Sequence, residues 1–164
     1  MTKRVVLIGH PVAHSLSGAM QQAAFDELGI DADADLRAID LGPDDVAAAI
    51  DEIPVLCLAA ARARGTTTIR GAGELRHKES DRIAGIAAGL AAMGASVEVA
   101  GDDLRIHGGA ALRGAVTDSL DDHRLAMTFA VAGLIARGTT VVGRPASAAI
   151  SYPGFFTELE GVRT

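Results

Sequence analysis

The heptapeptide Ala-Arg-Gly-Thr-Thr-Thr-Ile at residues 63–69 recurs as Ala-Arg-Gly-Thr-Thr-Val-Val at residues 136–142, 73 positions further along the chain. Each copy follows an apolar stretch, stops it at a glycine and continues into β-branched residues. The pattern therefore predicts a helix followed by a strand at both places. A repeat with so long a period is typical of a duplicated supersecondary unit.

The elements expected around the two copies follow one order. From residue 35 to residue 107 the order is strand, helix, strand, helix, strand, strand, and from residue 112 it restarts but stops after its second helix. We therefore expect an α/β fold of the α+β type, with one complete βαβαββ unit and a partial second unit. The expected strands are residues 5–8, 35–41, 66–69, 96–100, 104–107, 112–117 and 139–142, and the expected helices are residues 17–28, 44–50, 55–64, 78–93 and 122–137, with a short one after Pro153.

Composition excludes several classes of protein. The 164 residues carry a net charge of −6, so no global positive field attracts nucleic acid. The single cysteine, Cys57, rules out an intrachain disulfide and a cysteine-based zinc site, and no metal or cofactor is expected. Charged residues interrupt every apolar run before it reaches membrane-spanning length, and the first residues lack a signal-peptide pattern. We expect a soluble cytoplasmic protein.

A charged cluster at residues 75–83 is the first candidate site. If a helix begins at Lys78, then Lys78 and Arg82 lie on one face at positions i and i+4, while Glu79 points about 100° away. The helix start would then present two cations beside a carboxylate. The alternative is a solvated helix start whose charges satisfy one another.

Two further groups precede apolar helices. Asp121 or Asp122 is a good N-cap, and Arg124 would add a planar fork for a carboxylate or phosphate at the helix N-terminus. Asp51 stands at the entry to the helix expected at residues 55–64, where it could cap the helix or accept a proton from a substrate hydroxyl. In isolation, each group is better explained as a cap.

Four segments together resemble one family. Residues 75–83 are similar to the R-x-K-E-[ST]-D-R motif of enolpyruvyl-shikimate-phosphate synthases, and residues 51–56 to that family's D-E-x-P-x-L segment. Residues 122–127 resemble its D-H-R-x-A-M segment, and residues 151–156 its closing S-[YF]-P-x-F. All four occur in family order, and the resemblance covers residues 51 to about 162, roughly the last quarter of a family member.

The resemblance implies a reaction and a role for each charged residue. The family transfers the enolpyruvyl group of phosphoenolpyruvate to the 5-hydroxyl of shikimate 3-phosphate, in aromatic amino-acid biosynthesis. Asp51 would help to deprotonate that hydroxyl, Lys78 would stand near both substrates, and Glu79 would handle the proton at the methylene carbon. Arg82 and Arg124 would hold the anionic groups of phosphoenolpyruvate.

Most of a family member is missing from this pattern, so we expect 3-phosphoshikimate 1-carboxyvinyltransferase activity to be feeble or absent. A catalytically inactive chimera or remnant is the alternative. His77 also departs from the family, which usually has an apolar residue at that position.

The first part of the chain resembles a different family. Residues 9–17 are similar to the G-x-P-[IV]-x-H-S-x-S opening of shikimate dehydrogenases, and this resemblance covers about residues 3–48. It implies that Ser15 and Ser17 bind the carboxylate of shikimate, whereas the alternative is a helix-capping turn. A glycine, Gly18, replaces that family's proline, and no G-x-G-x-x-G follows a strand, so hydride transfer is excluded. A shikimate-binding module is therefore a third possible function.

The chain thus resembles a fusion, with a βαβ segment at residues 1–50 and an enolpyruvyl-transferase-like segment at residues 51–164, expected to fold as one compact domain. The strand at residues 35–41 could lead the complete βαβαββ unit, and the strand at residues 5–8 could complete the partial one. Unpaired strand edges in the unfinished unit would favour a homodimer.

Overall fold

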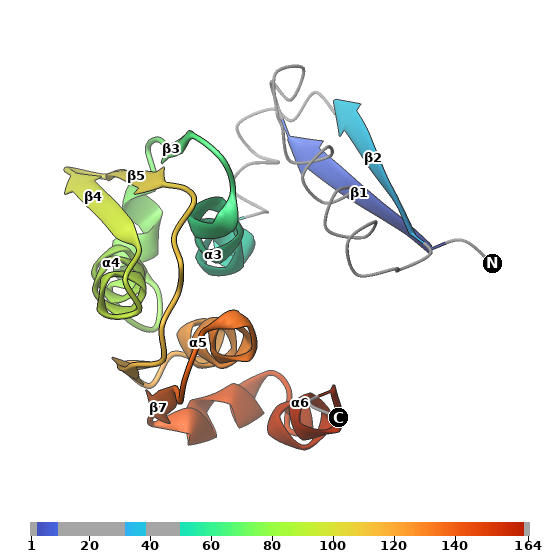
Figure 1. Ribbon diagram of the computed structural model, residues 1–164. Helices are drawn as coiled ribbons and strands as arrows, with labels where there is room; N and C mark the ends of the chain where they lie inside the picture. The colour runs from blue at the N-terminus through green and yellow to red at the C-terminus, as the bar shows by residue number, and fades with distance from the viewer. Residues whose placement is uncertain (1–2, 10–31, 39–49, 163–164) are drawn as a thin grey trace. The chain divides into compact units, whose positions relative to one another are not determined.

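The structure, a computed structural model, describes residues 3–9, 32–38 and 50–162. The chain divides into two compact units, Met1–Ala49 and Ile50–Thr164 (Figure 1).

The described part of the first unit is a two-stranded parallel sheet. Strand β1 (Lys3–Gly9) pairs with β2 (Ala32–Ala38), and the register runs from Lys3 opposite Ala32 to Gly9 opposite Ala38. The strand expected at residues 5–8 is confirmed, whereas the one expected at residues 35–41 begins and ends three residues earlier. The helix expected at residues 17–28 lies outside the described residues, as do Ser15 and Ser17, and so does the helix expected at residues 44–50 except for its last residue, Ile50, which belongs to a short 3-10 helix.

The second unit alternates helices and strands. Its elements are η1 (Ile50–Glu52), α3 (Ile53–Arg62), β3 (Thr66–Ile69), η2 (Gly73–His77), α4 (Arg82–Ala92), β4 (Ser96–Ala100), β5 (Asp103–His107), β6 (Val116–Asp118), α5 (His123–Ile135), β7 (Val141–Gly143), η3 (Pro145–Ile150) and α6 (Phe155–Val162).

The repeated heptapeptide joins a helix to a strand in both places. Gly65 and Gly138, with φ of 86° and 95°, follow α3 and α5 and lead into β3 and β7. A left-handed backbone of this kind suits glycine, because other residues meet a steric penalty there. The repeated pattern therefore predicts the helix-to-strand transition at both positions.

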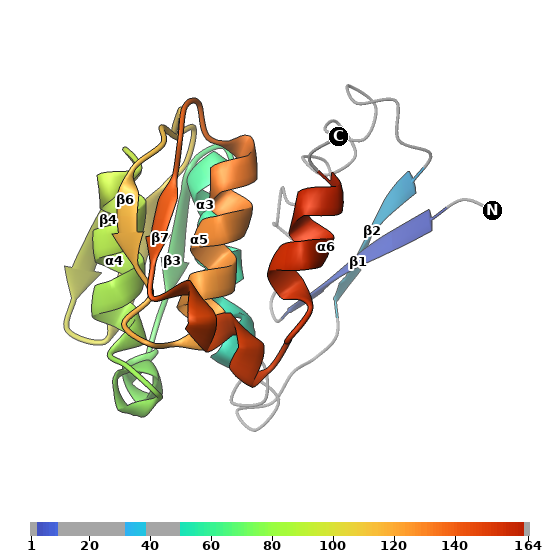
Figure 2. The same cartoon turned by 90° about the horizontal axis from the view of Figure 1, so that it is seen from below.

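Two separate sheets flank the helices. The first is antiparallel in the order β3-β5-β4, with the expected hairpin at Gly101 and Asp102 between β4 and β5. The second is a parallel pair, β6 and β7, in which Val116 lies opposite Val141. In Figure 1, α3, α4 and α5 are seen nearly end on with the strands outside them, and Figure 2 shows the same helices from the side.

The core lies between these helices and the inner faces of the sheets. Phe129 of α5 is fully buried against α4, where Gly89 leaves the room for its ring: a Cβ at Gly89 would lie 2.1 Å from Phe129 Cζ. The main buried side chains around it are Leu75, Ile83, Ile86, Leu90, Met93, Leu104, Ile106, Leu112 and Leu125. Aliphatic packing around one aromatic ring thus holds the site-bearing helices together.

Several expected boundaries were wrong. Pro54 lies in the first turn of α3 rather than before the helix, since proline needs no amide partner there. Helix α3 is also less buried than its apolar sequence predicts, because Val55 and Leu56 are 43% and 44% exposed. The strands expected at residues 112–117 and 139–142 are shorter, at Val116–Asp118 and Val141–Gly143. Helix α4 begins at Arg82, not at Lys78.

In the part of the chain that the structure describes, no helix combines the length and apolarity that crossing a membrane requires. Residence in the cytoplasm stays a prediction.

Candidate functional site

The starts of three helices meet at one end of the second unit. Asp51 precedes α3 in η1, Arg82 is the first residue of α4, and Asp122 is the N-cap of α5. The amides and dipole of a helix N-terminus attract negative charge, so this end of the unit suits carboxylates or a bound anion.

Arg82 stands at the centre of this arrangement. Its side chain is 1% exposed, and each nitrogen of its guanidinium donates to a carboxylate: Nε to Asp122 Oδ2 at 2.7 Å, one terminal nitrogen to Asp51 Oδ1 at 2.6 Å, and the other to Glu79 Oε2 at 2.6 Å. A buried guanidinium needs such partners to offset its lost hydration. Three carboxylates from separate segments therefore share one buried cation.

Asp122 has no exposed surface and serves two functions. Its Oδ1 accepts the Arg124 amide at 2.9 Å, capping α5, while its Oδ2 accepts from Arg82 and from the Ser80 hydroxyl at 3.0 Å. Burial alone would raise the pKa of Asp122, but the hydrogen bonds and charge of Arg82 leave that pKa below its ordinary value. Asp122 is thus ionised and fixed in position.

Asp51 is held mainly by the same guanidinium. The hydrogen bond from Arg82 lowers the pKa of Asp51, although partial desolvation opposes it, and the charges of Arg124 and Lys78 add to the lowering. A carboxylate with a depressed pKa is a weak proton acceptor while the guanidinium stays beside it. Asp51 can act as a base only if Arg82 turns toward another anion.

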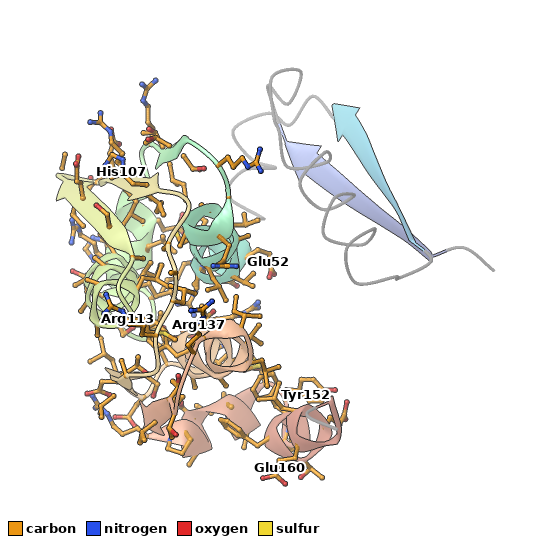
Figure 3. All side chains as sticks on the ribbon, viewed as in Figure 1. Glu52, His107, Arg113, Arg137, Tyr152 and Glu160 are labelled. Atoms are coloured by element: carbon orange, nitrogen blue, oxygen red, sulfur yellow. The ribbon has the colours of Figure 1, made fainter. Side chains whose placement is uncertain are left out.

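Arg124 and Lys78 are more accessible and also have internal partners. Arg124 donates to Glu52 Oε1 at 3.1 Å and lies 3.7 Å from Asp51 Oδ2, while its buried Nε has no hydrogen-bond partner. Lys78 Nζ donates to Glu74 Oε1 at 2.8 Å. Figure 3 shows Glu52 at the start of α3. Both cations are 24–29% exposed, so each can reach a ligand.

A small hollow of about 110 Å³ opens beside this network, between the starts of α3 and α5. Its lining combines the charged residues Asp51, Glu52 and Arg124 with the apolar residues Val55, Met127 and Val131, and with Thr128. Sites for small-molecule ligands usually measure about 300–1,000 Å³, so this hollow is too small to enclose such a ligand by itself.

Carboxylates outnumber cations in the network. Arg82, Arg124 and Lys78 are paired with five carboxylates, those of Asp51, Glu52, Glu74, Glu79 and Asp122. Any anion that bound these arginines would therefore have to displace internal carboxylates.

The structure brings Asp51, Glu79, Arg82 and Arg124 into one network, although they are distant in the chain. The expected helical pairing of Lys78 with Arg82 is wrong, because Lys78 follows η2 and lies outside α4. The sequence predicts Asp122 as a cap but not as the buried partner of Arg82. The roles of Glu52 and Ser80 were missed, since neither spacing nor composition distinguishes them from surface residues.

Comparison with known proteins places this network in a family. The family model for EPSP synthase (3-phosphoshikimate 1-carboxyvinyltransferase) matches residues 7–159. The chain belongs to the EPSP synthase family. The α/β fold is confirmed by the EPSP synthase of Acinetobacter baumannii, whose solved structure matches with a TM-score of 0.68 and 40% identity, over 78% of this chain and 30% of that one.

Relatives in the EPSP synthase family are much longer than this chain. The 3-phosphoshikimate 1-carboxyvinyltransferase of Synechococcus elongatus is 50% identical over 127 residues, which cover 77% of this chain and 28% of the relative. That of Roseiflexus sp. is 57% identical over 113 residues, or 69% of this chain and 26% of the relative. The chain therefore spans less than a third of the length of these relatives.

The EPSP synthase match includes most of the segment that resembles a shikimate dehydrogenase, since it begins at residue 7. These matches do not support the second resemblance, and the roles of Ser15 and Ser17 stay predictions. Among the described residues, no cluster of three or more His, Cys, Asp or Glu side chains is arranged to hold a metal ion.

Proposed function

We propose that this chain carries part of an enolpyruvyl-transfer site, the part that binds phosphoenolpyruvate next to the hydroxyl of shikimate 3-phosphate. The observation that supports this most is the convergence of Arg82 and Arg124, 42 positions apart, on Asp51 at the N-termini of three helices. A phosphate and a carboxylate on one small molecule require two such cations.

The proposed roles follow from chemistry and position. Arg82 and Arg124 bind the anionic groups of phosphoenolpyruvate, which frees Asp51 to accept the proton of the attacking hydroxyl. Once phosphoenolpyruvate displaces it from Arg82, Glu79 takes up a proton and gives it to the methylene carbon as the C–O bond forms; it takes one back when phosphate leaves the tetrahedral intermediate, and the proton on Asp51 departs with the phosphate. Lys78 stabilises the negative charge of both substrates.

We further propose that the chain binds phosphoenolpyruvate weakly and turns over feebly. Each cation is already paired with a carboxylate, and this sequence matches only 28% of the length of the Synechococcus relative. An inert remnant is the second candidate, and the neutralised cations are the observation that favours it.

The test is calorimetric titration of the whole chain with phosphoenolpyruvate, with a turnover assay using both substrates. Glu52→Gln removes a competing carboxylate from Arg124, so we expect affinity to rise about two- to fivefold. Arg124→Ala should lower it by at least about tenfold. Glu98→Gln is the matched control, because Glu98 is equally exposed and pairs with Arg105 away from the site.

Two outcomes would contradict the proposal. No heat at millimolar phosphoenolpyruvate would favour the inert remnant, and equal affinities of Glu52→Gln and Glu98→Gln would show that Arg124 does not bind the ligand. Shikimate affinity that falls in Ser15→Ala and not in Arg124→Ala would instead favour a shikimate-binding module.

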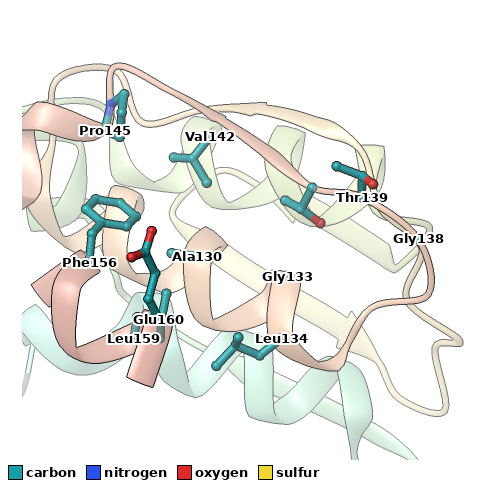
Figure 4. A pocket seen from close by; sticks show the side chains of 11 residues that line it. Ala130, Gly133, Leu134, Gly138, Thr139, Val142, Pro145, Phe156, Leu159 and Glu160 are labelled. Atoms are coloured by element: carbon teal, nitrogen blue, oxygen red, sulfur yellow. The ribbon is translucent and has the colours of Figure 1, made fainter. Parts of the chain in front are cut away.

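We also propose that the chain forms a homodimer. Among the described residues, the sheet of β6 and β7 consists of these two strands, and Val116 and Val141, opposite one another, are 75% and 52% exposed. Beside β7, a groove of about 820 Å³ runs between α5 and α6, with Leu134, Phe156 and Leu159 among its walls (Figure 4). Such surfaces favour association. A monomer in gel filtration with light scattering would refute the dimer.

A further inference from the structure

The turn that leads into α5 has an unusual backbone. Leu120 and Asp121 are consecutive non-glycine residues with φ of 55° and 59°, and the Asp122 amide donates to the Ser119 carbonyl at 2.9 Å across them. Positive φ at both central positions is the pattern of a type I′ turn, which favours Asn-Gly. Leucine pays a steric penalty there, so something else must hold the turn.

Arg144 holds the turn from the other side. Its Nε and one terminal nitrogen donate to the two oxygens of Asp118 at 2.8 and 2.6 Å, and its other terminal nitrogen donates to Asp121 Oδ2 at 2.7 Å. Asp118 Oδ1 in turn accepts the Leu120 amide at 3.0 Å. One planar side chain therefore fixes carboxylates on both sides of Leu120.

The backbone of Arg144 is also part of this connection. The Ser119 hydroxyl donates to the Arg144 carbonyl at 3.0 Å, and the Ser119 amide donates to the Gly143 carbonyl at 3.3 Å. Arg144 itself has a φ of 53° and directly precedes Pro145. The main chain and the side chain of Arg144 therefore both form hydrogen bonds with the turn at residues 119–122.

We propose that Arg144 is a positioning residue for the anion site. Its guanidinium holds the strained turn at Leu120 and Asp121, and the turn in turn keeps Asp122 in place as the N-cap of α5 and as the partner of Arg82. Asp122 directly follows the two strained residues, so relaxation of Asp121 to negative φ would rotate the buried carboxylate away from Arg82 Nε. This inference rests on the proposed function only where it calls the network around Arg82 an anion site.

An ordinary surface ion pair would have little effect, and Arg144 is 45% exposed. The contacts of Arg144 differ in two ways. Arg144 binds Asp118 through two parallel hydrogen bonds, and Asp118 and Asp121 flank or form a turn whose positive φ is sterically unfavourable. The effect should therefore be local, at the start of α5, and not a general loss of stability.

The test compares two helix-start amides in the whole chain by NMR hydrogen exchange. The Arg124 amide is held by the Asp122 carboxylate, and the Ala84 amide by the Asp81 carboxylate at the start of α4. In Arg144→Gln we expect exchange at Arg124 to accelerate by about tenfold or more, while Ala84 stays within about twofold. Arg105→Gln, which removes another exposed ion-paired arginine, should change neither rate.

A second variant tests the role of strain. Glycine tolerates positive φ without penalty, so adding Asp121→Gly to Arg144→Gln should restore slow exchange at Arg124, although it removes a charge. Unchanged exchange in Arg144→Gln, or failure of Asp121→Gly to restore it, would overturn the proposal. If Arg144→Gln unfolds, Arg144→Lys replaces it: faster Arg124 exchange supports the proposal and unchanged exchange refutes it. No ligand is needed, so the result stands even if the chain binds no phosphoenolpyruvate.

Discussion

At the scale of single residues, Arg82 determines both the stability of the site and its chemistry. Its three carboxylate partners lie 2.6 to 2.7 Å away, and one of them, Asp122, is completely buried. The ion pairs offset the hydration that Arg82 and its three carboxylate partners lose when they are partly buried. It also means that the cation proposed to bind phosphoenolpyruvate is occupied while no ligand is present.

Removal of Arg82 should be costly for this reason. Arg82→Ala leaves Asp122 buried without its cation, and breaking a buried pair in this way typically costs about 3–5 kcal/mol of the free energy of unfolding. Arg105→Ala, which removes an exposed partner of Glu98, should cost about 0–1 kcal/mol. Urea unfolding monitored by circular dichroism measures both. Equal losses in the two variants would mean that the burial of Arg82 is not maintained in solution.

The same pairs predict how stability depends on pH. The pKa values of Asp51 and Asp122 are lowered below the ordinary 3.8, chiefly through Arg82 against the effect of burial. Their stabilising contribution is therefore complete above pH 3.8 and is lost as pH falls through the lower folded-state pKa values. Asp51 and Asp122 should therefore not change the urea midpoint between about pH 7 and 5, whereas below about pH 4 the midpoint should decrease. The urea midpoint of Asp122→Asn should fall less steeply with decreasing pH than that of the unsubstituted protein. An equal slope would contradict the assignment of the pH dependence to Asp122.

Single residues also show the limits of sequence-based prediction. The acid and base types at Asp51, Glu79, Arg82 and Arg124 are evident from the motifs. The burial of Asp122 beneath Arg82 is not, because it depends on how closely α4 and α5 approach each other. Sequence spacing carries no information on that distance.

At the scale of elements, the approach of α4 to α5 depends on glycine. Gly85 and Gly89 lie one turn apart on α4, and a Cβ at these positions would come within 2.5 Å of Leu125 and 2.1 Å of Phe129. The two glycines therefore allow the start of α4 to bring Arg82 against the cap of α5. Apolar periodicity predicts the helix, but it does not distinguish a glycine that permits contact from one that merely weakens the helix.

Gly89→Ala tests this packing. Helix propensity alone would favour alanine by about 1 kcal/mol, but the clash with Phe129 should outweigh it and give a net loss of about 1–3 kcal/mol. Gly161→Ala in α6 is the matched control, because a Cβ there meets nothing within 4 Å and should stabilise slightly. Both are read from thermal unfolding. A stabilised Gly89→Ala would show that α4 and α5 lie further apart in solution.

The start of α4 shows why element boundaries were only partly predictable. Residues 78–81 fit a helical pattern, yet the Asp81 carboxylate accepts the Ala84 amide and so defines the N-cap. Arg76 in turn pairs with Asp81 at 2.9 Å. A cap competes locally with one more helical turn, and here the hydrogen bond from the Ser80 hydroxyl to Asp122 favours the cap.

At the scale of the whole molecule, the chain divides into two compact units, and the match to the EPSP synthase family covers most of both. The hydrophobic core described above lies entirely within residues 50–162. The fold class follows from the repeated heptapeptide, because each copy specifies a helix, a glycine and a strand in the same order. The pairing of β2 was not predictable, since strands of similar composition can join either neighbour.

A fragment of residues 50–164 tests whether this unit is independent. If its stability comes from its own core, the fragment should unfold in urea as one cooperative transition, at a midpoint close to that of the whole chain. Amide protection in α4 and α5 should also be unchanged, because the Arg82 network lies wholly inside the fragment. Should the fragment instead aggregate or lose its cooperative transition, the core within residues 50–162 does not suffice for folding without residues 1–49.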